Sequence, residues 1–171
     1  MDLASLIRDV PDFPVPGILF KDITTLIQEP DAFKYVVDEL TSQYQDESID
    51  AIAAIESRGF IFGAPLAYTL GAGFVIVRKP GKLPSSSISE SYSLEYGTNM
   101  LEVHEDAIQP GQRVLLVDDL LATGGSARAA VNLVERLGGE VAGIVFLIEL
   151  DFLNGRDQLE DYPIFSLVHF D

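Results

Sequence analysis

Short apolar runs alternate with segments of helical periodicity along most of this 171-residue chain. The segments whose apolar side chains share one helical face cover residues 31–44, 60–70 and 127–137. The apolar runs predicted to be buried strands cover residues 49–55, 73–77, 114–117, 141–150 and 164–168, of which 141–150 is expected to be central. Strands that alternate with helices predict an α/β fold, with a mostly parallel central sheet covered by helices on both faces.

Two stretches break this alternation. Residues 3–10 are predicted to form a short helix. Residues 11–23 follow as an extended N-terminal arm, because prolines push the residues before them out of the helical region. Residues 78–91 predict a long polar loop, and the alternation about Gly97 over residues 92–103 predicts a hairpin. Long loops in compact domains are usually lids or binding loops, so we expect a flexible lid hairpin here.

The composition is that of one ordinary globular domain over residues 1–171. There are 27 acidic and 11 basic residues, a net charge of −16, which argues against nonspecific binding of nucleic acid and against docking on an anionic membrane. The absence of cysteine excludes thiol chemistry, and two histidines leave little material for a histidine-based metal site. The N-terminus is unlike a signal peptide and no run approaches ~18 apolar residues, so a cytoplasmic protein is expected.

The most informative stretch for function covers residues 114–126, where a strand meets polar and small residues. Asp118 and Asp119 follow the apolar run, and five small residues precede the next helix: Ala122, Thr123, Gly124, Gly125 and Ser126. Ligands of open α/β sheets bind at the carboxyl ends of strands. Small residues at a helix N-terminus expose N–H groups that suit a phosphate. A sugar phosphate would fit both halves, whereas the plainer alternative is a chain reversal beside two solvated acids. Neither common glycine-rich phosphate motif is present.

The few cations of this acidic chain are informative where they follow strands. Arg58 lies at a strand-to-helix turn, where it is a candidate anion ligand; a surface ion pair is the alternative. Lys79 and Lys82 lie, with Arg78, in a group of three cations within five residues directly after another strand. Glu95 lies where the lid turns, although most such glutamates are simply exposed strand acids.

Several segments together resemble the adenine phosphoribosyltransferases, a group of the type I phosphoribosyltransferases. Residues 114–126 resemble the family's phosphoribosyl pyrophosphate signature throughout. The other matching segments, in the right order, are Pro-Asp-Phe-Pro-Val-Pro-Gly-Ile-Leu-Phe-Lys-Asp-Ile (11–23), Glu-Ser-Arg-Gly-Phe (56–60), Arg-Lys-Pro-Gly-Lys-Leu-Pro (78–84) and Ser-Tyr-Ser-Leu-Glu-Tyr-Gly (91–97). The resemblance covers nearly the whole chain. Some relatives carry arginine at the positions of Lys21 and Pro80 and threonine at that of Ser126. None of these differences removes a hydroxyl or a cation that the chemistry needs, although affinity at the purine site can differ.

The resemblance implies an enzyme of purine salvage that transfers the 5-phosphoribosyl group from phosphoribosyl pyrophosphate to adenine, giving AMP and pyrophosphate. It also implies a homodimer. It assigns catalysis to Glu95, with Tyr96 beside it, and to Asp118 and Asp119, which would also hold the ribose hydroxyls. The 5′-phosphate is assigned to Ala122, Thr123, Gly124, Gly125 and Ser126, and pyrophosphate to Arg58, Lys79 and Lys82. Adenine is assigned to Leu19, Phe20 and Lys21.

The chemistry agrees with these implied roles. Displacement of pyrophosphate from C1 of the ribose builds oxocarbenium character. Carboxylates favour that cation, while Mg²⁺ and side-chain cations stabilise the departing pyrophosphate. Mg²⁺ is expected to bind mainly through the substrate, and Glu95 is expected to accept the proton on N7 of adenine. Two alternatives stay open. One is a transferase for hypoxanthine or xanthine, and the other is a non-catalytic regulator that binds the sugar phosphate.

Overall fold

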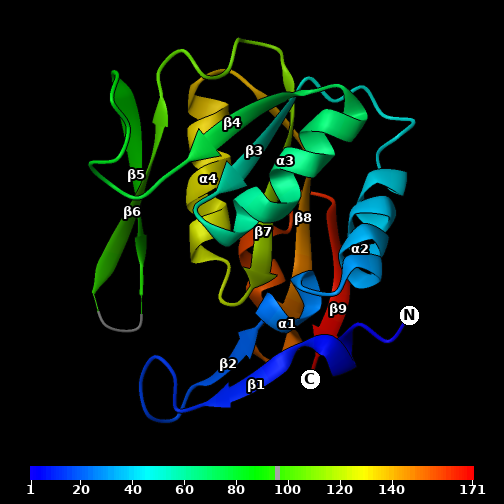
Figure 1. Cartoon of the computed structure of the whole chain (residues 1–171). Coiled ribbons are helices and arrows are strands. Elements are labelled where there is room, and N and C mark those ends of the chain that lie inside the picture. The colour runs from blue at the N-terminus through cyan, green and yellow to red at the C-terminus, as the bar shows by residue number, and fades with distance from the viewer. Residues whose placement is uncertain (95–96) are drawn as a thin grey trace. The chain divides into compact units, whose positions relative to one another are not determined.

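The computed structural model of the chain describes residues 1–94 and 97–171 (Figure 1). Within these residues the chain forms two compact units, 1–39 and 40–171. The expectation of one domain over the whole chain stays a prediction. None of the described helices is long and apolar enough to cross a membrane.

The first unit contains a short antiparallel hairpin of β1 (Arg8–Pro11) and β2 (Leu19–Asp22). Arg8 lies opposite Asp22 and Asp9 opposite Lys21, and both form ion pairs, at 2.8 Å and 2.6 Å. Opposite charges in facing positions stabilise a hairpin. The helix predicted over 3–10 is therefore wrong for most of its length: η1, a 3-10 helix, covers only Ala4–Leu6, and pairing with β2 holds the following residues extended. The remaining helices are α1 (Thr24–Ile27) and α2 (Pro30–Ser42), which spans the boundary between the units.

The second unit is centred on a five-stranded parallel sheet, which confirms the predicted α/β class (Figure 1). In spatial order the strands are β4 (Gly73–Val77), β3 (Ala51–Ile55), β7 (Arg113–Leu121), β8 (Glu140–Leu150) and β9 (Ile164–Phe170). The central strand is β7 and not β8, so that part of the prediction is wrong. Both strands have neighbours on either side and near-continuous apolar sequences, as expected for parallel strands buried on both faces.

Helices cover both faces of this sheet. α4 (Gly125–Arg136) packs in one cluster with Ala51 and Ala53 of β3. α3 (Arg58–Leu70) instead brings Gly63 against Ile52 and Ala54. Because alternate residues of a strand point to opposite faces, the two helices lie on opposite sides of the sheet. The predicted helices 31–44, 60–70 and 127–137 are confirmed as α2, α3 and α4, and the last two begin two residues earlier than expected.

A second antiparallel hairpin, of β5 (Ser87–Ser93) and β6 (Thr98–His104), extends from the second unit (Figure 1). The hairpin about Gly97 is confirmed, but the loop predicted over 78–91 ends sooner, because Ile88 and Tyr92 pack against the core as alternate residues of a strand. The hairpin is attached at the end of β4: the Arg78 and Glu102 backbones exchange hydrogen bonds of 2.9 Å and 2.7 Å. The connection from β8 to β9 contains η2 (Asp151–Leu153) and η3 (Gly155–Leu159).

Candidate active site

Both candidate aspartates lie inside β7. The sequence predicts that this strand ends at residue 117, but it continues to Leu121 because residues beyond the aspartates still pair with β8. Asp118 is only 8% exposed and Asp119 only 5%. The alternative of two solvated strand-end acids is therefore wrong. Two adjacent buried carboxylates are costly unless partners compensate them, and such groups gather at functional sites.

A tight turn joins β7 to α4. Gly124 has a φ of +87°, a left-handed conformation that residues with a side chain rarely adopt. As the N-cap residue of α4, Gly124 has no side chain with which to cap the helix. The first backbone N–H groups of α4 therefore need another partner, and an anion would satisfy both them and the helix dipole. Tyr92 of the hairpin closes one side of this turn, since a Cβ on Gly125 would lie 3.3 Å from its ring.

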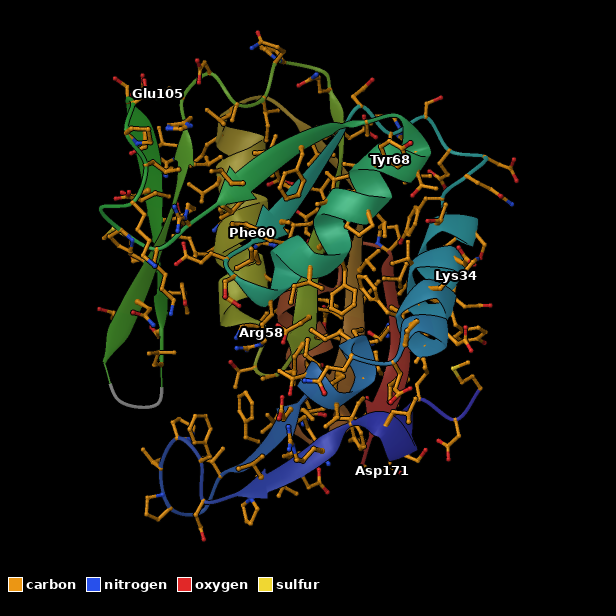
Figure 2. The ribbon with its side chains drawn as sticks, viewed as in Figure 1. Lys34, Arg58, Phe60, Tyr68, Glu105 and Asp171 are labelled. Carbon is orange, nitrogen blue, oxygen red and sulfur yellow. The ribbon has the colours of Figure 1, made fainter. Side chains whose placement is uncertain are left out.

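The start of α3 brings a cation to the aspartates. Arg58 is the first residue of this helix (Figure 2). Its Nε donates to Asp119 Oδ2 at 2.5 Å. The side chain of Arg58 stays 49% exposed, so it can reach a ligand as well. Gly59 makes this approach possible, because a Cβ there would lie 2.9 Å from the carbonyl oxygen of Val117 and 3.2 Å from Asp118 Oδ1. The helix could not come so close with a larger residue.

A buried glutamate at the end of β3, Glu56, binds further cationic residues. Glu56 follows β3 directly, its peptide bond to Ser57 is cis, and its side chain is 5% exposed. Its carboxylate accepts from Arg78 Nε at 2.7 Å, from Lys82 Nζ, and from the backbone N–H of Lys79 at 3.3 Å. The loop after β4 is thereby held beside the end of β3.

These groups surround a cavity of about 470 Å³ at the carboxyl edge of the sheet. Its charged lining residues are Arg58, Arg78, Lys79 and Lys82, with Glu56, Asp118 and Asp119. A neighbouring cavity of about 250 Å³ shares both aspartates, Arg58, Tyr92 and Ser126, and continues along Ala122, Thr123 and Gly124. A third cavity, of about 300 Å³, lies in the first unit beside Arg8, and none of the described candidate residues lines it. The two joined cavities are thus the candidate site.

Asp118 and Glu56 are both buried, but their pKa values are shifted in opposite directions. Burial raises the pKa of Asp118 well above its usual range, the charge of Asp119 raises it further, and Arg58 only partly opposes both effects. Burial also acts to raise the pKa of Glu56, but the hydrogen bonds from Lys82 and Arg78 outweigh it and leave that pKa below its usual value. Glu56 is therefore an anion at neutral pH, whereas burial disfavours the charged form of Asp118.

The structure brings together most of the candidate residues in the second unit. Arg58, Lys79, Lys82, both aspartates and four of the five turn residues line the joined cavities. Gly125 is the first residue of α4. The adenine candidates belong to the first unit, on β2, where the Lys21 side chain is only 10% exposed and pairs with Asp9. Glu95 and Tyr96 lie outside the described residues.

Sequence reasoning missed three residues of the site: Glu56, Arg78 and Tyr92. The signal for Glu56 was present, since an acid directly after a fully apolar strand lies at the ligand-binding edge of a parallel sheet. Arg78 held the same position after β4. Tyr92 gave no signal, because only the hairpin geometry brings it to the turn before α4.

The donor set of the cavity suits a metal ion only when a substrate is bound. Asp119 is already paired with Arg58, and four cations line the same space. Among the described residues, the side chains close enough to hold an ion as a group of three are Glu149, Asp151 and His169, which do not line the cavity. A hard cation that takes most of its oxygen ligands from substrate phosphates and water fits this arrangement.

Comparisons with known proteins agree on one family. A sequence model of the phosphoribosyl transferase domain matches residues 24–168. The adenine phosphoribosyltransferase of Chloroflexus aurantiacus is 62% identical over 169 residues, which cover 99% of this chain and 98% of the relative. The crystal structure of adenine phosphoribosyltransferase from Thermoanaerobacter pseudethanolicus has a TM-score of 0.96 at 55% identity, covering 99% of this chain and 98% of that one. The enzyme from Saccharomyces cerevisiae, crystallised with adenine and D-2,5-dideoxy-2,5-imino-altritol 1,6-bisphosphate, has a TM-score of 0.91 at 43% identity, covering 97% and 96%. The chain therefore belongs to the phosphoribosyltransferase family and, within it, to the adenine phosphoribosyltransferases.

Proposed function

We propose that the joined cavities are the active site in which this family member transfers the 5-phosphoribosyl group from phosphoribosyl pyrophosphate to adenine, giving AMP and pyrophosphate. The observation that carries the proposal is the distribution of charge. Four of the eleven lysines and arginines line one cavity in a chain whose net charge is −16. Such a local excess of cations favours a polyanion. The two buried aspartates beside it suit the hydroxyls of a ribose.

Each part of the sugar substrate has proposed partners. Asp118 and Asp119 receive the 2′- and 3′-hydroxyls. The turn from Ala122 to Ser126, named here the phosphate cradle, receives the 5′-phosphate through backbone N–H groups and hydroxyls. Arg58, Lys79 and Lys82 bind the pyrophosphate. What supports this division is the order of residues along the cavity walls: Ala122, Thr123 and Gly124 line one cavity and the lysines line the other. Both aspartates and Ser126 line both cavities.

The adenine half of the reaction rests on the family resemblance. Leu19, Phe20 and Lys21 are proposed to bind adenine, and Glu95 is proposed to accept the proton from N7 as N9 attacks C1 of the ribose. Tyr96, beside Glu95, is proposed to bind the substrate when the lid closes. Closure would exclude water, which could otherwise hydrolyse the activated ribose.

Enzymes of this family use a divalent metal ion with phosphoribosyl pyrophosphate, and we propose that the ion is Mg²⁺. When bound, it would neutralise charge on the departing pyrophosphate. The protein's own residues orient the sugar: the aspartates fix the ribose, the cradle fixes its 5′-end, and Arg58 and the lysines hold the leaving group on the other side of C1.

Two measurements test the assignment. The first compares initial rates with adenine, hypoxanthine, guanine and xanthine; adenine is expected to be fastest, and faster turnover of an oxopurine would overturn the adenine assignment. The second replaces Glu95 by Gln, which is expected to lower turnover by about 10²–10⁴-fold while phosphoribosyl pyrophosphate still binds. Glu105→Gln, an exposed acid just after β6, is the control and should keep full activity. An inactive parent protein that still binds the sugar phosphate would favour the non-catalytic regulator.

Three further expectations belong to the same proposal. A homodimer follows from the family resemblance and is tested by light scattering on the purified protein, where a monomer at catalytic concentrations would contradict it. One cooperative domain over the whole chain predicts a single unfolding transition. A cytoplasmic location is tested by cell fractionation.

A further inference from the structure

The segment between β8 and β9 lies directly behind the phosphate cradle. Gly124 and Gly155 pack so closely that a Cβ on Gly124 would lie 2.5 Å from the carbonyl oxygen of Gly155. A Cβ on Gly155 would in turn lie 2.4 Å from the carbonyl oxygen of Ala122. Real Cβ atoms do not come so close to backbone oxygens, so both positions require glycine. The cradle therefore has no room to move towards this segment.

A side-chain hydrogen bond joins the same two segments. Gln158 Nε2 donates to the carbonyl oxygen of Thr123 at 3.1 Å. Thr123 lies in the middle of the cradle, next to the left-handed Gly124. A donor on this carbonyl fixes the orientation of the peptide plane between the two residues, and the N–H of that peptide belongs to Gly124. Gln158 thus controls where one N–H group of the cradle points.

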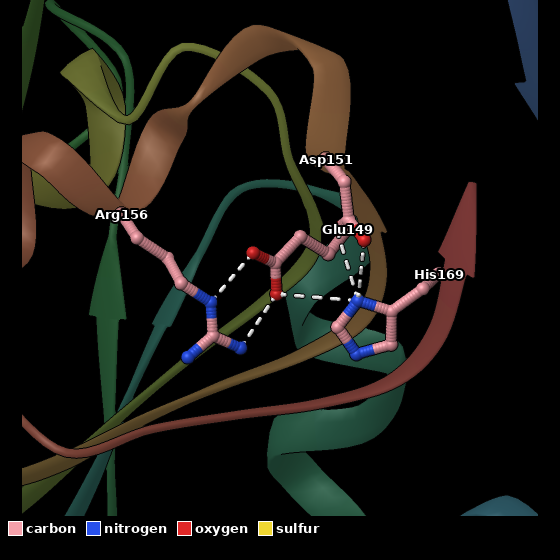
Figure 3. Close-up of polar contacts among 4 residues, drawn as sticks. All are labelled: Glu149, Asp151, Arg156 and His169. Carbon is pink, nitrogen blue, oxygen red and sulfur yellow. Dashed lines mark hydrogen bonds and ion pairs between the residues drawn. The ribbon is translucent and has the colours of Figure 1, made fainter. Parts of the chain in front are cut away.

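An ion pair holds this segment to the sheet (Figure 3). Arg156 donates from Nε and from a terminal nitrogen to the two oxygens of Glu149, at 2.6 Å and 2.7 Å. Glu149 is 5% exposed near the end of β8, and the two-point contact with Arg156 lowers its pKa. His169 Nδ1 lies 2.9 Å from Asp151 at the start of the segment. A two-point contact between a guanidinium and a buried carboxylate fixes orientation as well as distance.

A metal site is a poorer explanation of this cluster. Glu149, Asp151 and His169 lie close enough to share an ion. Both oxygens of Glu149, however, already accept hydrogen bonds from Arg156, and the guanidinium charge beside them would repel a cation. The contacts instead serve to fix the position of residues 155–158.

We propose that Arg156 and Gln158 are positioning residues for the 5′-phosphate: the ion pair between Arg156 and Glu149 holds the segment in place, and the segment holds the phosphate cradle in its binding conformation. This inference rests on the proposed function of the cradle. It adds residues that touch no substrate and that lie 30 or more positions after the cradle in the sequence. It also explains why a buried acid and an arginine occupy a place outside the cavity.

The test distinguishes the subsite for the 5′-phosphate from the subsite for pyrophosphate. Gln158→Ala removes the hydrogen bond to Thr123, so the KM for phosphoribosyl pyrophosphate is expected to rise about threefold to tenfold, the effect of one hydrogen bond. Arg156→Met frees the whole segment, so a rise of roughly tenfold or more is expected. Arg156→Lys keeps the charge without the two-point geometry, so its KM for phosphoribosyl pyrophosphate should lie between those of the wild type and Arg156→Met. The affinity for ribose 5-phosphate should fall in parallel, whereas the KM for adenine and the affinity for pyrophosphate stay unchanged.

The control is Arg113→Met. Arg113 also makes two ion pairs, with Glu47 and Glu140, but it does so at the amino end of β7. Its loss is expected to lower the melting temperature without changing the KM for either substrate. If Arg156→Met lowers the melting temperature as Arg113→Met does and leaves the KM for phosphoribosyl pyrophosphate unchanged, the segment is only structural and the inference is wrong.

A failure of the proposed function looks different. Ser126→Ala alters the cradle itself and should weaken ribose 5-phosphate binding. If the parent protein neither turns over adenine nor binds ribose 5-phosphate, the assignment of the cradle falls, and the inference falls with it. If the parent is active and Ser126→Ala weakens binding while Gln158→Ala and Arg156→Met do not, the cradle stands and the positioning role alone is refuted.

Discussion

Asp118→Asn should make this protein more stable and less active at the same time. The Asp118 carboxyl is buried, and its pKa is raised by burial and by the neighbouring charge of Asp119. Its carboxylate accepts a hydrogen bond from the backbone N–H of Asp119 at 2.8 Å, and an asparagine oxygen can accept that bond equally well. The substitution therefore keeps the shape and the acceptor while it removes a charge that the fold disfavours.

The size of the effect follows from the linkage between protonation and folding. A carboxyl whose pKa is raised in the folded state contributes stability below its unfolded pKa, near 3.9, and loses that contribution as the pH rises towards the folded pKa. Across this window the wild type should lose about 1.4 kcal/mol per pH unit relative to Asp118→Asn. For a chain of this length, that corresponds to about 3–6 °C in melting temperature per pH unit. At pH values above the pKa of Asp118 in the folded state, the difference in stability between the wild type and Asp118→Asn should stay constant.

Thermal and urea unfolding of the wild type and of Asp118→Asn, measured from pH 4 to pH 8, would test this. Asp106→Asn makes the same chemical change at an exposed position and should leave the unfolding curve unchanged. Turnover of Asp118→Asn should fall by about 10²-fold or more, as for the loss of a group placed to stabilise charge in the transition state. A variant that is less stable than the wild type at pH 7, or a difference that does not change with pH, would refute the reasoning about burial.

Three other substitutions test neighbouring parts of the site. Arg58→Ala should raise the KM for phosphoribosyl pyrophosphate by roughly tenfold or more, as for loss of a charged hydrogen bond; steady-state kinetics with an unchanged KM would contradict its role. Gly59→Ala should abolish most turnover, because a methyl group 2.9 Å from a β7 carbonyl oxygen forces α3 away from Asp118; normal activity and melting temperature would show that the contact yields easily. Glu56→Gln should lower stability at pH 7 by about 1.5–3 kcal/mol. Because the pKa of Glu56 is lowered in the folded state, the difference in free energy of unfolding between the wild type and Glu56→Gln, measured with urea, should narrow below about pH 4.3. A difference that widens in acid would be inconsistent with the ion pairs.

The architecture of the second unit was largely predictable from sequence, because the spacing of apolar residues along its helices and strands indicates which of their faces are buried. Residues 73–77 are bounded by a glycine and a cationic loop, and the strand there forms over those same residues. The start of α3 was placed two residues late, because Arg58 and Gly59 carry no apolar side chain that could continue the helical stripe. The position of Gly59 depends on a contact with β7, and periodicity contains no information on contacts between elements.

The extent of β7 could not be predicted because charge normally marks the end of a buried strand. Carboxylates are rarely found inside a sheet unless they are paired, and the two aspartates were therefore placed at its edge. The structure keeps them in the strand, where Arg58 compensates Asp119 and the N–H of Asp119 compensates Asp118. The alternation of polar and apolar residues about Gly97 was visible, but the extra length of β5 was not, since serines occupy its exposed face and Glu90 interrupts the apolar face between Ile88 and Tyr92.

The buried acid Glu56 shows why the local balance of charge matters more than the total. It holds Arg78 and Lys82 beside the end of β3, and its lowered pKa keeps it ionised at neutral pH. Without this anion, four cations in one cavity would repel each other and spread into solvent. With it, four cations face three carboxylates, and burial disfavours the charged form of one of these, Asp118. The cavity therefore stays positive inside a chain of net charge −16, and the same buried group that lowers the repulsion also fixes the directions in which the cations can meet a pyrophosphate.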